Sequence, residues 1–227
     1  MSSAGYTERN EEYKMGRKLI NWLGLTGLLS LISYTAAVVF SPLAYPGYNW
    51  MAQAVSDLSA DSAPSRMLWN QLSAFYGTGG IICVVCVAVF VSERKVSSKL
   101  FRTGIYLFAL MNLISNVGYR MFPLADGGKE IGSFQEIMHM IVTGFVVILS
   151  IVSLAILITA GRREKQVRGI GIWAAIALAM MLAGAIGTGT VPPAYFGIVE
   201  RFSVFAAVGF TAVLGLYLFT GFAKENK

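Results

Sequence analysis

Six long apolar stretches, nearly free of charged residues, constrain this 227-residue chain more than any other feature of its sequence. A helix needs about 20 mostly apolar residues to cross the hydrocarbon core of a bilayer. Only 13% of the residues are charged, against about a quarter in a soluble domain. The sequence therefore predicts an all-α fold, a polytopic membrane protein with six transmembrane helices in one bundle. The expected helices cover residues 19–40, 67–91, 100–122, 134–160, 169–191 and 198–222.

The polar segments around these stretches predict how the chain is divided. We expect a polar cytoplasmic leader at residues 1–18, a six-helix domain at residues 19–223 and a cytoplasmic tail at residues 224–227. The apolar region of a secretory signal peptide has only about 7–15 residues, and the first stretch is longer. We therefore interpret it as a retained transmembrane helix.

Lysine and arginine residues divide unequally between alternate loops. Loops rich in these residues stay in the cytoplasm during membrane insertion. The division predicts a multi-pass protein of the plasma membrane with both termini in the cytoplasm. The predicted cytoplasmic set is Arg9, Lys14, Arg17, Lys18, Arg94, Lys95, Lys99, Arg102, Arg162, Arg163, Lys165, Arg168, Lys224 and Lys227, and the outer set is Arg66, Arg120, Lys129 and Arg201.

The net charge of +6 at pH 7 does not indicate a nucleic-acid partner. The basic residues form short clusters between apolar stretches, without the interleaved aromatic residues of a nucleic-acid groove. The two cysteines, Cys83 and Cys86, lie three residues apart inside an apolar stretch. Buried cysteines in such a setting pack as small apolar residues, so we predict no redox or metal role for them.

Three local patterns predict packing and capping. Small residues recur every four positions in the fifth stretch, a spacing that lets membrane helices approach closely; they are Ala175, Ala179, Ala183 and Gly187. The segment Trp50–Ser59 is expected to form a short interfacial helix. Asp61 or Ser62, just before Pro64, is expected to cap the second helix.

Polar residues gather at the ends of the stretches opposite the basic loops. Asn112, Asn116 and Arg120 recur at i, i+4 and i+8 on one helix face, and Glu136 and His139 share a face of the next helix. Polar groups at membrane depth are costly and mark functional sites by default. We predict a polar cavity open to the outer side; the alternative is a set of separate caps and interfacial anchors. The predicted ligand-binding residues are Asp57, Asn70, Asn116, Arg120, Glu136, His139, Glu200 and Arg201.

Several short motifs resemble a known family. They are QAVSDLSADSAP at Gln53–Pro64, Phe122-Pro123 with Asp126, His139, and GIVER at Gly197–Arg201. Over roughly residues 19–222 the chain resembles the prokaryotic six-helix membrane family called domain of unknown function 998. The resemblance implies the six-helix topology but no reaction. It draws attention to Ser56, Asp57, His139, Glu200 and Arg201.

The first of these motifs departs from the family pattern. The family more often has Ser-Glu-Leu-Gly where this chain has Ser56-Asp57-Leu58-Ser59. The difference counts against any role there that needs a longer carboxylate or a glycine with a positive φ angle.

The histidine count argues against metal chemistry. A zinc site needs three or four ligands, and the chain has one histidine. Glu136 and His139 match half of a di-iron motif, but a di-iron site needs a second copy and two further glutamates. No phosphate-binding or dinucleotide-binding glycine motif is present in the sequence. We predict neither a metal nor a cofactor.

Two functional classes fit the polar residues, and a third class, which gives these residues no role, is also considered. The favoured one is a protein that binds membrane lipids or a small amphiphilic ligand. The alternative is a metal-free hydrolase or transferase for outer-leaflet lipids, with His139 as acid or base, Glu136 or Glu200 orienting it, and Ser56 or Ser59 as nucleophile. A structural scaffold is the third. The sequence favours binding over catalysis and leaves the question of an enzyme open.

Overall fold

A computed structural model describes residues 17–123 and 133–222. These residues form helices, turns and loops, with no strand among them. Six helical segments in this part are long and apolar enough to cross a membrane, which confirms the predicted number. They are Leu19–Ala44, Arg66–Glu93, Lys99–Met121, Phe134–Arg163, Lys165–Thr190 and Pro193–Phe219.

Two of the six segments are interrupted, at Gly24 and at Ser73, and the last two begin with a short 3-10 turn. Serine side chains begin two helices, since Ser98 accepts from the Phe101 N–H and Ser133 from the Glu136 N–H. The helices are α2 (Leu19–Leu23), α3 (Leu25–Phe40), α4 (Arg66–Leu72), α5 (Ala74–Glu93), α6 (Lys99–Met121), α7 (Phe134–Arg163), α8 (Arg168–Thr190) and α9 (Phe196–Phe219). The 3-10 turns are η1 (Ser41–Ala44), η2 (Ser56–Ser59), η4 (Lys165–Val167) and η5 (Pro193–Tyr195).

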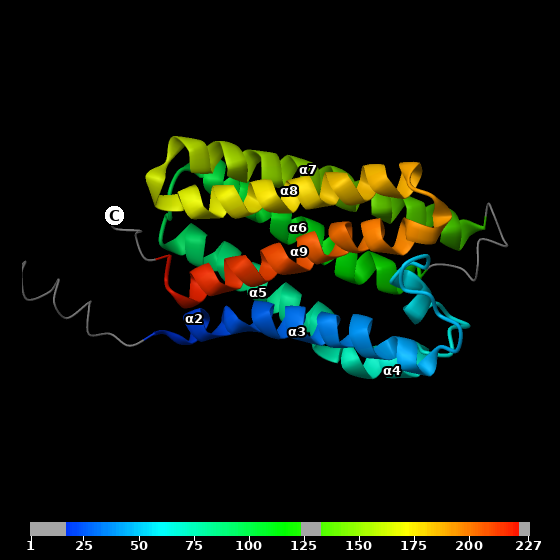
Figure 1. Ribbon diagram of the computed structural model, residues 1–227. Coiled ribbons are helices and arrows are strands. Elements are labelled where there is room, and N and C mark those ends of the chain that lie inside the picture. The colour runs from blue at the N-terminus through cyan, green and yellow to red at the C-terminus, as the bar shows by residue number, and fades with distance from the viewer. Residues whose placement is uncertain (1–16, 124–132, 223–227) are drawn as a thin grey trace, which may run out of the picture.

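The helices run side by side along one common direction (Figure 1). Neighbours in sequence are neighbours in space from α5 to α9, and α9 also packs on α3 and α5. Residues 41–65 lie at one end, which we call the loop end, and the start of α2 and the end of α9 lie at the other, the terminal end (Figure 1). The loop end therefore collects the end of α6 and the beginnings of α7 and α9.

Two apolar clusters hold the bundle together. The larger one joins α5, α6, α7, α8 and α9 and includes the fully buried Phe101, Phe108 and Leu157. The smaller one lies at the loop end, where Tyr34 and Trp69 pack with residues of the 41–65 loop. Many large apolar side chains remain exposed on the outside of the bundle, as expected where lipid is the solvent.

Small residues do bring α8 close to its neighbours, and of the four predicted positions Gly187 is confirmed as one of them. Ala175, Ala179 and Ala183 are exposed, so that part of the prediction was wrong. The α8 residues that meet other helices are Gly171, Ala174, Ala177, Gly184 and Gly187. A strip read at a strict spacing of four drifts around a helix with 3.6 residues per turn, and the contact face follows the helix.

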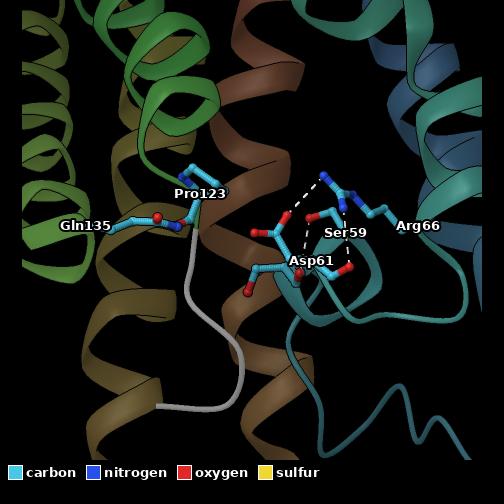
Figure 2. Close-up of polar contacts among 6 residues, drawn as sticks. Ser59, Asp61, Arg66, Pro123 and Gln135 are labelled. Carbon is cyan, nitrogen blue, oxygen red and sulfur yellow. Dashed lines mark hydrogen bonds and ion pairs between the residues drawn. The ribbon is translucent and has the colours of Figure 1, made fainter. Parts of the chain in front are cut away.

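The loop between the first two spans differs from the expected interfacial helix. Within Trp50–Ser59 only η2 is helical, as a single 3-10 turn. The capping prediction was wrong as well, because the N-cap residue of α4 is Ser65. Asp61 instead forms an ion pair of 3.0 Å with Arg66, which also donates to the Asp61 carbonyl (Figure 2).

The second span is interrupted at Ser73, between α4 and α5. Ser33 of α3 bridges the break: its hydroxyl donates to the Leu72 carbonyl at 2.5 Å and accepts from the Phe75 N–H at 3.3 Å. One turn earlier on α3, Ser30 donates to the Tyr76 carbonyl at 2.6 Å. Backbone groups freed inside a membrane must find such partners. The α3 serines thus fix the loop end of α5, where Gly77 lies.

Candidate functional site

Arg201, near the start of α9, fastens the long loop to the bundle. Its Nη1 donates to the carbonyl oxygens of Trp50 at 2.7 Å, Gln53 at 3.2 Å and Gly197 at 2.6 Å. Its Nη2 donates to the phenolic oxygen of Tyr48 at 2.8 Å. The guanidinium is therefore occupied by the chain's own acceptors. It acts as a clamp that holds the loop, and few of its N–H donors remain for a ligand.

Gly197 is part of the same clamp because it lets the loop backbone touch α9. A Cβ atom at this position would meet the Gln53 carbonyl oxygen, and it would lie 2.5 Å from the Trp50 carbonyl oxygen. Both obstacles are backbone atoms, so any side chain would force the loop away. The Gly197–Arg201 and Gln53–Pro64 motifs are thus in direct contact.

Asp57 and Glu200 both accept backbone N–H groups of this loop. Asp57 Oδ2 accepts from Ala54 at 3.1 Å, and Glu200 Oε2 accepts from Val55 at 3.2 Å. Burial raises the pKa of Asp57, although the Ala54 N–H and the charge of Arg201 act in the opposite direction. Burial also raises the pKa of the Tyr48 phenol. Tyr48 stays protonated at neutral pH and donates to the Ala54 carbonyl at 2.8 Å.

A second polar group lies on α6 and faces α5. Asn112 is buried, Asn116 is half-buried and Arg120 is exposed, so this face opens towards the loop end. A Cβ atom on Gly77 of α5 would lie 2.8 Å from Asn116 Oδ1 and 3.2 Å from Arg120 Nη2. Because Gly77 has no side chain, the Asn116 amide and the Arg120 guanidinium can both pack against the backbone of α5 at this position.

Arg120 differs from the other arginines of the loop end. Its guanidinium forms no hydrogen bond or ion pair with any residue in the described ranges, 17–123 and 133–222. Arg66 is paired with Asp61, and Arg201 is held by the loop. Asn116 donates through Nδ2 to the Asn112 carbonyl at 2.9 Å, which leaves its Oδ1 beside Arg120. Among the described residues, Arg120 thus keeps its donors available at the end of an apolar bundle.

His139 belongs to a third group, between α6 and α7. Its Nδ1 lies 2.8 Å from the Phe122 carbonyl oxygen, and Gln135 donates to the Pro123 carbonyl at 2.9 Å. Figure 2 shows Gln135 beside Pro123. Carbonyl groups at the end of a helix lack partners within the helix. His139 and Gln135, one turn apart on α7, therefore cap the end of α6.

The ring of His139 also packs on Tyr119, with ring centroids 5.0 Å apart. Thr143 accepts from the Tyr119 hydroxyl at 3.2 Å and donates to the His139 carbonyl at 2.8 Å. These contacts fix the imidazole between α6 and α7. Its Nδ1 is oriented by a carbonyl, and among the described residues no hydrogen bond joins it to Ser56 or Ser59.

The structure brings the predicted site residues together in three groups. Asp57, Glu200 and Arg201 meet at the loop, Asn116 and Arg120 meet over Gly77, and His139 lies against the end of α6. Glu136 is in the first turn of α7 and has interactions of its own. Asn70 is exposed on α4, and Ser56 begins η2, where its carbonyl accepts from Ser59. Among the described residues, no hydrogen bond or ion pair joins one of the three groups to another.

Sequence reasoning missed the aromatic residues that pack together at the loop end of the bundle. Tyr34 of α3 packs on Tyr76 of α5 with ring centroids 4.7 Å apart, and on Phe205 of α9 at 5.4 Å. Tyr48, which the clamp uses, is not among the predicted site residues either. A phenol inside a transmembrane stretch is a signal that was available, since a buried tyrosine hydroxyl usually needs a polar neighbour.

Comparison with known proteins places the chain in a family without an assigned activity. The family model described as "Protein of unknown function (DUF998)" matches residues 28–217. No curated protein and no solved structure matches the chain. The match covers all six candidate spans in whole or in part. The chain belongs to this family of unknown function, as its motifs suggested.

Proposed function

We propose that this membrane protein binds a lipid or a small amphiphilic ligand, and that Arg120 and Asn116 hold an anionic group of that ligand at the loop end. One observation carries the proposal: Arg120 is exposed beside the Asn116 amide, without a hydrogen-bonding or ionic partner among the described residues. A guanidinium with open donors binds a phosphate or carboxylate with two parallel hydrogen bonds.

The surroundings of Arg120 favour an amphiphile over a fully water-soluble ligand. Val117 and Met121, on the same part of α6, are exposed apolar residues. Phe75 of α5 is exposed as well, near Gly77. An anionic headgroup at Arg120 would thus place its apolar part along lipid-facing side chains.

We also propose that the loop end faces the outer side of the plasma membrane and that both termini are cytoplasmic. The support is the distribution of charge on the bundle. Basic residues of the described chain concentrate at the terminal end, in the α5–α6 and α7–α8 connections. Short basic loops of this kind are retained in the cytoplasm. The ligand would then come from the outer leaflet or the outer solution.

The hydrolase alternative has less support. His139 already serves as a cap for the end of α6, and the serines suggested as nucleophiles belong to the clamp loop. A nucleophile and its base must come within hydrogen-bond reach of each other. Binding needs no such alignment, and we therefore propose binding.

The proposal is tested by lipid retention. Purified wild type and Arg120→Gln are incubated in detergent with an anionic phospholipid, and the bound lipid is counted by native mass spectrometry. We expect Arg120→Gln to lose about tenfold in affinity or more, since a charge-assisted hydrogen bond contributes about 1.5–3 kcal/mol. Gly77→Ala keeps the arginine but displaces it, and we expect a loss in the same direction.

Arg66→Gln is the matched control, because Arg66 is also exposed at the loop end but is paired with Asp61. It should leave lipid retention unchanged. Equal retention by wild type and Arg120→Gln would refute the proposal. Equal losses in Arg120→Gln and Arg66→Gln would also refute it, because they would indicate a general effect of surface charge.

A further inference from the structure

Glu164 joins the α5–α6 and α7–α8 connections at the terminal end. Its Oε2 accepts from the Ser98 backbone N–H at 3.0 Å and from the Ser97 hydroxyl. Burial opposes its charge, but hydrogen bonds from the two serines and the nearby charge of Arg102 hold the pKa of Glu164 below its usual value. One ionised carboxylate therefore holds the two connections together, and the basic residues around it share one surface.

This surface is strongly basic. Residues 92–102 and 161–168 contain eight basic side chains and two acidic ones, Glu93 and Glu164. None of the eight has an ion-pair partner within 4 Å in the described part of the chain. We call six of them, which α6, α7 and the start of α8 bring together, the basic edge: Lys99, Arg102, Arg162, Arg163, Lys165 and Arg168. Arg102 is half-buried, and the other five are exposed.

Two cations of the basic edge lie where a helix disfavours them. Lys99 is the first residue of α6 and Arg168 is the first residue of α8, and neither helix has an acidic residue in its first turn. The N-terminus of a helix carries a partial positive charge, which favours acidic side chains and disfavours basic ones. These cations therefore add to the positive potential of the two helix ends, and the surface attracts negative charge from its surroundings.

Apolar side chains beyond the basic edge indicate that the negative charge belongs to a lipid. Ile172 and Trp173 follow Arg168 by about one turn of α8, and they are 54% and 47% exposed. Tyr106, which is 40% exposed, follows Arg102 by one turn of α6. Tryptophan and tyrosine are enriched at the level of lipid headgroups. A lipid with its phosphate at the basic edge would thus have its acyl chains along these exposed residues.

We propose that the basic edge binds an anionic phospholipid of the leaflet at the terminal end. Lys165 and Arg168 hold its phosphate, and its chains lie against Trp173 of α8. Clusters of about 4–8 basic residues beside transmembrane helices bind anionic headgroups by this electrostatic attraction. The basic edge and Arg120 lie at opposite ends of α6, so this inference does not rest on the proposed function. In the proposed orientation, the leaflet concerned is the cytoplasmic one.

Quenching of Trp173 fluorescence by brominated lipid chains tests the inference. The protein is reconstituted into vesicles of phosphatidylcholine and phosphatidylglycerol, in which one lipid at a time carries brominated acyl chains. The emission of Trp173 is the difference between wild type and Trp173→Phe, and the position is exposed, so phenylalanine should not disturb the fold. The two quenching curves give the ratio of the binding constants of the two lipids beside Trp173.

We expect phosphatidylglycerol to be preferred about tenfold or more beside Trp173, because each basic residue near an anionic headgroup contributes about fivefold. Lys165→Gln/Arg168→Gln should reduce the preference to less than about twofold. Arg17→Gln/Lys18→Gln is the matched control. It removes as many exposed cations from the terminal end, just before α2 and outside the basic edge, and should keep the wild-type preference. Should the first double variant fail to insert, Arg168→Gln alone is measured, with an expected loss of about fivefold.

Three results would overturn the inference: no preference in wild type, a preference that survives removal of Lys165 and Arg168, or an equal loss in the matched control. Inorganic phosphate at constant ionic strength should leave the preference unchanged. Competition by phosphate would assign the basic edge to a soluble anion and would also overturn the inference. Arg120→Gln should keep the preference beside Trp173, so this inference and the proposed function can fail independently.

Discussion

Arg201 donates to the hydroxyl of Tyr48 at 2.8 Å, and this bond joins the start of α9 to a loop about 150 positions earlier in the chain. The same guanidinium donates to three backbone carbonyls, and the Tyr48 hydroxyl donates a hydrogen bond to the Ala54 carbonyl. The loop is therefore held by a connected set of hydrogen bonds centred on one side chain. A hydrogen-bond network of this kind stabilises a structure when every polar group has a partner, and losing one partner lowers the stability.

Arg201→Gln should release the loop without unfolding the bundle. Removing the charged donor lowers the free energy of loop opening by about 2 kcal/mol, which corresponds to about thirtyfold more of the open state. Limited proteolysis within residues 48–57 should accelerate by a similar factor, since cleavage follows the population of the open form. Tyr48→Phe, which removes one acceptor from Arg201 and the donor to the Ala54 carbonyl but keeps the charged clamp, should give a smaller increase. Unchanged cleavage in Arg201→Gln would contradict the clamp.

Asp57 should make the protein less stable as the pH rises above about 4. Burial raises the pKa of this carboxyl in the folded state, so the folded chain binds the proton more tightly than the unfolded chain does. Stability then falls as the pH rises from the unfolded pKa, about 3.9, through the folded one, and is constant above both. Glu200 and Arg201 are the charged neighbours that also act on this loop.

Asp57→Asn removes this proton linkage while keeping an oxygen for the Ala54 N–H. We expect its melting temperature to match that of wild type near pH 4, to exceed it as the pH rises through the folded pKa, and to keep a constant lead above that. Thermal unfolding of both proteins in detergent between pH 4 and 8 measures the difference. A difference that shrinks as the pH rises would show that the folded carboxyl has a lowered pKa.

The proposed orientation predicts which single cysteines react from outside the cell. Ala194 at the loop end and Ser92 at the terminal end are both exposed, and cysteine is close in size to both. In a background with Cys83 and Cys86 replaced by alanine, a membrane-impermeant maleimide should label Ala194→Cys in intact cells. Ser92→Cys should react only after the membrane is permeabilised. The opposite pattern would reverse the topology.

His139→Gln should separate capping from catalysis. If His139 caps α6, the variant should lose about 1 kcal/mol of stability, the worth of one hydrogen bond, while lipid retention changes by less than about twofold. Lipid turnover, followed by mass spectrometry, should be absent from wild type and variant alike. Turnover by wild type that disappears in His139→Gln would instead establish the histidine-dependent hydrolase.

The transmembrane helices could be predicted because each one corresponds to its own apolar stretch in the sequence. The chain must satisfy its backbone within every span, so an apolar stretch of sufficient length has few alternatives to a helix. The break at Ser73 has no such pattern in the sequence. It depends on Ser33 of another helix, whose hydroxyl supplies the backbone hydrogen bonds that the break removes. The packing face of α8 was misassigned for a related reason: Ala174 and Ala175 are identical residues, and the fold alone decides which is buried.

Most residues of the candidate site could be predicted from the sequence, but which of them contact one another could not. Asn116, Arg120, Glu200 and Arg201 stand out as polar residues in apolar surroundings. Nothing in the sequence distinguishes Arg201, which the loop carbonyls occupy, from Arg120, which has no partner among the described residues. That difference arises from contacts between segments far apart in the chain. Gly77 and Gly197 mark those contacts, but a glycine is informative only once its neighbour is known.

The most direct test of the proposed function is an experimental structure of the protein in a nanodisc that contains an anionic phospholipid. We predict a bound headgroup at the loop end, with a phosphate oxygen within about 3 Å of the Arg120 guanidinium and the Asn116 amide beside it. The structure would contradict the account if Arg120 were paired with a carboxylate of its own chain, or if ordered headgroups lay around the bundle and none at Arg120.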